Sequence, residues 1–270
     1  MTTQELYLLL DMPQDAADCL NSHAQTDLQW LTPEIRALYF SRATAGDGLK
    51  AMQAALGEDP DGMRLLWVLL EMARETWEGY VRRGISREIF ADTMKFVPRF
   101  LNTHHQQQGR YAFVCGWWFW RQLSMVEYRI GSLEYELVEE NGHREISLHI
   151  PSDADMSPAA IDASFAAFRA FLGQQYPDWQ QAPWVCNSWM MSPALPQLLP
   201  EGSNILAFQR RFTVESVNED SLGVLDWVFP PHKEVSDALP ENTSLQRRMK
   251  AWLLEGKKVG WARAVLRSNL

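Results

Sequence analysis

The sequence predicts an α+β protein, with an all-helical N-terminal domain packed on a mixed-sheet α/β C-terminal domain. Three observations predict this fold. Up to about residue 125, apolar residues recur at the spacing of three and four that is typical of helices. From about residue 130 the pattern changes to the alternation of strands. No spacer rich in Gly, Ser or Pro separates the two patterns, so we expect the two domains to pack on each other. The change of pattern places these domains at 1–126 and 127–270.

The amino-acid composition indicates a globular protein and the compartment in which it works. The chain is 46% hydrophobic and 22% charged, which is typical of a globular protein, and its net charge of -9 argues against a nucleic-acid partner. Three widely spaced cysteines, Cys19, Cys115 and Cys186, show no metal-ligand spacing and indicate a reducing compartment. The longest apolar run, 111–120, is about half of the ~20 residues that a membrane helix needs. We therefore expect a soluble, cytoplasmic protein without a membrane partner or a metal.

Capping signals divide the helical half into elements. Thr32 is a good N-cap, because Pro33 follows it at the first helical position. A long apolar stripe from residue 65 to residue 77 predicts a helix that Gly84 closes, and Ser86 is expected to cap the next helix. The polar stretch 104–109 is expected to form a loop.

A β-hairpin is the clearest element of the second half. Residues 133–138 and 145–150 alternate between apolar and polar, and Asn141-Gly142 between them is a strong hairpin signal. With this pair as the turn, the facing residues Leu137 and Ile146, Tyr135 and Leu148, and Leu133 and Ile150 all share one face. The same register places Glu134 opposite His149 on the other face.

The remaining elements follow from capping, periodicity and short apolar runs. They are a helix from Ser157-Pro158 to about Gln175, a covered strand at 184–191, short helical stretches at 193–199 and 203–211, two closing strands at 213–217 and 224–229, and a last helix at about 244–254.

Four segments in this order resemble a known family. They are Arg129–Tyr135, His149–Ser152, Trp184–Met191 and Ser203–Phe212. Together they are similar to a bacterial acyltransferase-domain family, which pairs a helical N-terminal domain with a C-terminal domain like the acyl-CoA N-acyltransferases (the GNAT fold). The resemblance implies acetyl-CoA or another acyl-CoA as co-substrate, and a small-molecule amine or peptide amine as acceptor.

The expected cofactor loop departs from that of active GNAT enzymes. Those enzymes hold the pyrophosphate of coenzyme A with the backbone N–H groups of a glycine-rich loop and a helix N-terminus. Here the corresponding loop, 151–157, has no glycine and carries Asp153 and Asp155. The helix start at Ser157 is the remaining anion site.

The resemblance places the pantetheine of coenzyme A between two splayed strands, at 145–150 and 184–191. The family's glycine-rich loop has no counterpart here, and we expect Ile150, Ser152, Ser157 and Asn187 to bind the cofactor.

The pair of His149 and Glu134 is the candidate catalytic site. A carboxylate that fixes the tautomer of an imidazole and raises its basicity is what a general base toward an amine requires. An exposed cross-strand pair with only a structural role is the other interpretation. Cys186 lies in an apolar strand and is expected to be an inert buried thiol.

Two hypotheses for the whole protein follow. The first is an acyl-CoA-dependent N-acyltransferase. The second is a GNAT-shaped scaffold that has lost coenzyme A and binds a protein or a small ligand, which the two aspartates of the loop favour.

Overall fold

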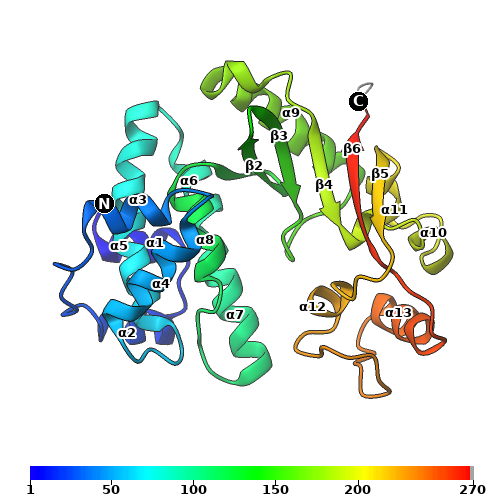
Figure 1. Ribbon diagram of the computed structural model, residues 1–270, viewed down its shortest axis with the longest axis horizontal. Helices are drawn as coiled ribbons and strands as arrows, with labels where there is room; N and C mark the ends of the chain where they lie inside the picture. The colour runs from blue at the N-terminus through cyan, green and yellow to red at the C-terminus, as the bar shows by residue number, and fades with distance from the viewer. Residues whose placement is uncertain (268–270) are drawn as a thin grey trace. The chain divides into compact units, whose positions relative to one another are not determined.

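The computed structural model describes residues 1–267, which form two compact units, 1–130 and 131–267. The first unit is helical and the second contains a mixed sheet with helices, as Figure 1 shows, so the predicted α+β class is confirmed. Within the described residues, no helix is both long and apolar enough to cross a membrane.

The first unit is built around one long helix, α5. Helices α1, α2, α4, α6 and α8 all contact α5, whose middle turns are buried. The elements are α1 (Thr3–Leu9), α2 (Gln14–Asn21), α3 (Pro33–Tyr39), α4 (Ala45–Leu56), α5 (Met63–Arg83), α6 (Arg87–Met94), α7 (Phe96–Gln108), α8 (Gly116–Leu123) and the strand β1 (Glu127–Ile130).

The helix boundaries agree with the capping signals, with one exception. The hydroxyl groups of Thr32 and Ser86 each accept a backbone N–H of the helix that follows, and Gly84 ends α5 with a φ of 64°. The predicted loop at 104–109 is wrong, because α7 continues through its polar residues to Gln108. Polar residues suit an exposed helix end, and Gly109 supplies the left-handed conformation that closes it.

The second unit alternates strands with short helices. Its elements are β2 (Leu133–Glu140), β3 (His143–His149), α9 (Pro158–Gln175), η1 (Pro177–Trp179), β4 (Trp184–Ser188), η2 (Trp189–Met191), α10 (Leu195–Leu198), α11 (Asn204–Gln209), β5 (Phe212–Asn218), α12 (Val224–Val228), α13 (Ser244–Leu254) and β6 (Trp261–Leu266). Within this unit the strand order of the sheet is β2-β3-β4-β6-β5. Strands β3 and β4 are parallel, whereas β2–β3, β4–β6 and β5–β6 are antiparallel.

The hairpin of β2 and β3 has the predicted register. Glu134 pairs with His149 and Glu140 with His143. Asn141 and Gly142 form the turn with φ values of 51° and 77°, and positive values at both central residues define the hairpin turn that matches the twist of the strands.

Helix α9 covers one face of the sheet (Figure 1). Tyr135 of β2 stacks on Phe168 of α9 with ring centroids 3.8 Å apart, and its hydroxyl lies 2.7 Å from the Ser164 hydroxyl. Trp184 of β4 meets Phe165 edge to face. Because side chains alternate along a strand, the opposite face of the sheet carries Glu134, Glu136, Glu145, Ser147, His149 and Asn187.

The second closing strand predicted at 224–229 is wrong. Residues Val224–Val228 form the short helix α12, and the strand that closes the sheet is β6, inserted between β4 and β5. Helix α12 packs into a second core outside the sheet. This core consists of Trp189, Leu195, Leu198, Leu206, Val224, Leu225, Val228, Phe229, Leu239, Met249, Leu253 and Val259.

Candidate active site

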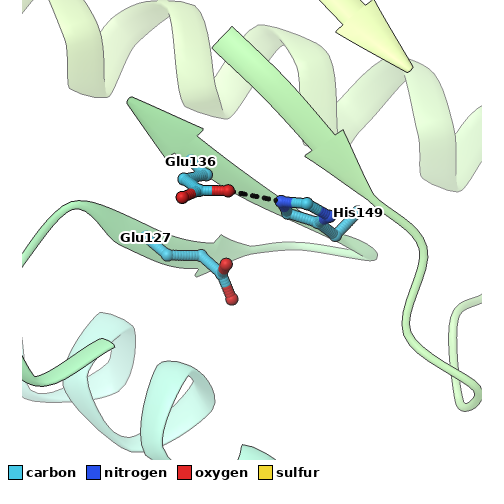
Figure 2. Close-up of side chains that lie close together, drawn as sticks. All are labelled: Glu127, Glu136 and His149. Carbon is cyan, nitrogen blue, oxygen red and sulfur yellow. Dashed lines mark hydrogen bonds and ion pairs between the residues drawn. The ribbon is translucent and has the colours of Figure 1, made fainter. Parts of the chain in front are cut away.

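The polar face of the sheet carries one histidine–carboxylate pair. His149 is the last residue of β3, and its Nε2 lies 2.9 Å from Oε2 of Glu136 on β2 (Figure 2). The side chain of Glu136 is 3% exposed and that of His149 is 23% exposed. The pair therefore joins a buried carboxylate to an imidazole that solvent reaches in part.

The carboxylate that bonds His149 is thus Glu136, two residues along β2 from the predicted Glu134. The register of the strands was predicted correctly, and both glutamates lie on the same face, next to His149. Glu134 is also buried, and its proposed catalytic role stays a prediction.

A buried carboxylate at Nε2 controls the chemistry of the ring. A carboxylate only accepts hydrogen bonds, so the proton of a neutral imidazole lies on Nε2 and the basic lone pair on Nδ1.

The Glu127 carboxylate, also drawn in Figure 2, accepts hydrogen bonds from Trp118 Nε1 at 3.3 Å and Gln122 Nε2 at 2.5 Å.

Strands β3 and β4 separate next to His149. Their pairing covers three residue pairs and ends at Leu148 and Cys186, whereas β4 continues to pair with β6 as far as Ser188. We call the region between the end of β3 and the segment Asn187–Ser188 the fork. At a fork, the backbone groups of a diverging strand are available to a ligand that lies between the strands.

The four predicted cofactor residues lie around this fork and at the start of α9. Ile150 directly follows β3, and Ser152 is exposed in the turn after it. Ser157 caps α9 by accepting the Ala160 N–H at 3.4 Å. Asn187 is exposed on β4, paired with Arg263 of β6.

The loop 151–157 is organised by its own side chains and backbone. Asp155 Oδ1 accepts the backbone N–H of Ser157 at 2.8 Å, and this hydrogen bond lowers the pKa of Asp155. Asp155 thus uses one of the N–H groups that precede α9. The two aspartates place negative charge where a pyrophosphate is expected.

One cation near this helix start was not predicted from the sequence. Arg211 donates hydrogen bonds to Asp162 and, at 3.4 Å, to the Pro158 carbonyl in the first turn of α9. The side chain is only 13% exposed. Its guanidinium offsets the negative charge of Asp162 near the start of α9.

A second ion-pair group lies on the same sheet face as His149. Arg263 of β6 donates to Glu145 of β3 at 2.8 and 3.3 Å, and to Glu215 of β5 at 3.1 Å. The hydrogen bond with Glu145 is the main cause that raises the pKa of Arg263.

Cys186 lies at the base of the fork but is fully buried. Burial raises the pKa of this thiol to about 12, so almost none of it is thiolate at neutral pH. The residue packs and does not act as a nucleophile, in agreement with the sequence-based expectation.

Comparison with known families covers almost the whole chain. Residues 1–125 match the family described as the N-acyltransferase N-terminal domain, and residues 127–266 match the GNAT-like C-terminal domain. A search of curated proteins finds no match.

Several solved structures share the fold. An acyltransferase in complex with decanoyl-CoA and teicoplanin is 23% identical, with a TM-score of 0.78 over 98% of this chain and 87% of that one. An acyltransferase mutant in complex with octanoyl-CoA is 22% identical, with a TM-score of 0.79 and the same coverage. At this level of identity the likeness concerns the fold. The family matches nevertheless span both units, and the chain belongs to the family of acyltransferases that combine an N-acyltransferase N-terminal domain with a GNAT-like C-terminal domain.

Proposed function

We propose that this protein is an acyl-CoA-dependent N-acyltransferase, with His149 as the general base that activates an amine. The observation that carries the proposal is the His149–Glu136 pair at the end of β3, beside the fork between β3 and β4. A base held by a buried carboxylate, next to a place where two strands diverge, suits the attack of an amine on a bound thioester.

The proposed reaction needs one base and an aligned pair of substrates. The amine nitrogen attacks the thioester carbonyl, so that the new C–N bond forms and the C–S bond breaks. The lone pair on Nδ1 of His149 takes a proton from the amine, and the imidazolium then gives that proton to the departing thiolate of coenzyme A, which regenerates the base. The Glu136 carboxylate stabilises the imidazolium that forms.

The residues around the fork fit coenzyme A in two respects. Ile150, Ser152 and Asn187 offer polar backbone or side-chain groups along a pantetheine laid between β3 and β4. The start of α9 at Ser157 is an anion-attracting helix end. The negative charges of Asp153 and Asp155 oppose binding of the pyrophosphate at the start of α9. We therefore expect the pyrophosphate to bind weakly and the pantetheine to contribute the larger share of the affinity.

The acceptor is proposed to be a primary amine on a small molecule or a peptide. Support comes from two neighbours of the same fold, one in complex with decanoyl-CoA and teicoplanin and one in complex with CoA and 10C-Teicoplanin. The cytoplasmic location expected from the cysteine content stays a prediction.

The test replaces the proposed base and measures acyl transfer. His149→Gln should lower kcat by about 10²- to 10⁴-fold, because general-base catalysis contributes that much, and should leave the dissociation constant of octanoyl-CoA unchanged. The assay follows octanoyl-CoA and a panel of amino sugars, amino-sugar glycopeptides and short peptides by mass spectrometry. His143→Gln is the matched control, because His143 is exposed on the same strand. A His149→Gln variant with more than a third of the wild-type kcat would refute the assignment of the base.

A further inference from the structure

The ion-pair group of Glu145, Arg263 and Glu215 spans strands that are not all neighbours. Strand β4 lies between β3 and β6, and the pair of Glu145 with Arg263 therefore crosses β4. The pair of Arg263 with Glu215 joins β6 to β5, which are hydrogen-bonded neighbours. We call the pair of Glu145 and Arg263 the cross-tie.

The cross-tie lies on the face of the sheet that carries His149. Glu145 is on the same face of β3 as His149, four residues earlier, and Arg263 pairs with Asn187 at the open end of the fork. The tie thus connects the closed part of the β3–β4 pairing with the strand that holds β4 in place beyond it.

The β3–β4 pairing is short, which makes an additional connection important. It extends over three residue pairs, whereas β4 and β6 pair over four. Parallel pairing is also slightly less stable per residue than antiparallel pairing. Without another connection, β3 and β4 can separate further at their last pair.

We propose that Arg263 and Glu145 are positioning residues, which set the opening of the fork and thereby the affinity for coenzyme A. This inference rests on the proposed function. The guanidinium of Arg263 donates two hydrogen bonds to the Glu145 carboxylate, at 2.8 and 3.3 Å. Two parallel hydrogen bonds fix the relative orientation of the two side chains as well as the distance between them. The side chains of Arg263 and Glu145 are 35% and 30% exposed, and the tie is therefore only partly screened by water.

The structure supplies a control variant of equal charge. Glu145→Gln and Glu215→Gln each remove one negative charge and one partner of Arg263 on the same face. Only Glu145→Gln breaks a connection across β4. Because the two variants have the same net charge, a difference between their affinities for coenzyme A is due to the loss of the cross-tie. It is not due to a change in the electrostatic attraction of the sheet for an anion.

Two measurements on the full chain test the proposal. Hydrogen exchange in the absence of coenzyme A should be roughly two- to fivefold faster at 146–149 and 184–188 in Glu145→Gln than in Glu215→Gln, as expected for the loss of a partly exposed ion pair. Calorimetry with coenzyme A alone should give a dissociation constant raised by a similar factor in Glu145→Gln. The kcat at saturating octanoyl-CoA should change by less than twofold.

The outcomes separate the two proposals. Equal exchange and equal affinity in the two variants, with a wild-type protein that binds coenzyme A, would overturn the cross-tie alone. A wild-type protein that binds no coenzyme A at millimolar concentration would overturn the proposed function and the role of the tie within it. Faster exchange confined to the fork together with weaker binding would support the proposal.

Discussion

At the scale of residues, the partner of His149 illustrates what a sequence determines. The alternation of the two strands predicted the register, and with it the residue directly opposite His149. A histidine also reaches the diagonal neighbour on the same face, because diagonal positions lie within range of long side chains. Backbone register does not decide between the two glutamates, and the rotamer that selects Glu136 depends on packing around the sheet.

The buried cysteines give a prediction at the same scale. Burial raises the pKa of Cys115 and Cys186 to about 12, so the thiolate fraction at pH 7.5 is on the order of 10⁻⁴ or less. Iodoacetamide should therefore leave both thiols unmodified in the native protein and label both in guanidinium chloride. Peptide mass spectrometry reads the labelling at each cysteine. Rapid stoichiometric alkylation of Cys186 in the native protein would contradict its structural role.

At the scale of elements, local signals predicted those elements that local interactions determine. Helix α9 has a serine N-cap followed by proline, and the hairpin has its Asn-Gly turn. Helix α12 was missed because Val224–Val228 is short and mostly apolar, and its two valines and its tryptophan favour strands. Its apolar residues pack as a helix into the second core. Strand β6 was missed because its partners, β4 and β5, lie far away in the sequence.

The connection from β1 to β2 allows a test of packing between the sheet and α9. Gly131 has a φ of 66°, and a Cβ there would lie 3.0–3.2 Å from atoms of Ser164. Gly142 has a φ of 77° in the hairpin turn, with open space around it. An alanine costs about 1–2 kcal/mol at either position for the left-handed backbone.

Gly131→Ala should therefore lower the free energy of unfolding by about 1–3 kcal/mol more than Gly142→Ala, because it also crowds Ser164. Chemical denaturation followed by tryptophan fluorescence measures the difference. Equal decreases in the free energy of unfolding would show that α9 shifts enough to accommodate the added methyl group next to Ser164.

The loop before α9 gives a second prediction for an element. Replacement of Asp153 and Asp155 by asparagine removes two negative charges and leaves side-chain oxygens that can still accept hydrogen bonds. The double variant should bind coenzyme A several-fold more tightly, most visibly at low salt, because the repulsion of the phosphates is removed. Calorimetry at two salt concentrations measures this. Unchanged affinity at low salt would place the phosphates away from this loop.

At the scale of the whole molecule, the class of fold followed from a change of period along the chain. Helical spacing up to about residue 125 and strand alternation after it correspond to a helical unit and a unit with a mixed sheet. The boundary after residue 126 stays a prediction. The order of strands was not predictable from periodicity, since β6 enters the sheet between β4 and β5.

The central claim is that acyl-CoA binds at the fork and is the acyl donor. Isothermal titration calorimetry of the purified full chain with octanoyl-CoA tests it most directly. We predict saturable binding of one molecule per chain, with a dissociation constant below about 1 mM, which corresponds to more than ~4 kcal/mol of binding free energy. A folded protein that gives no binding heat at several temperatures would contradict the account and favour a scaffold that has lost coenzyme A.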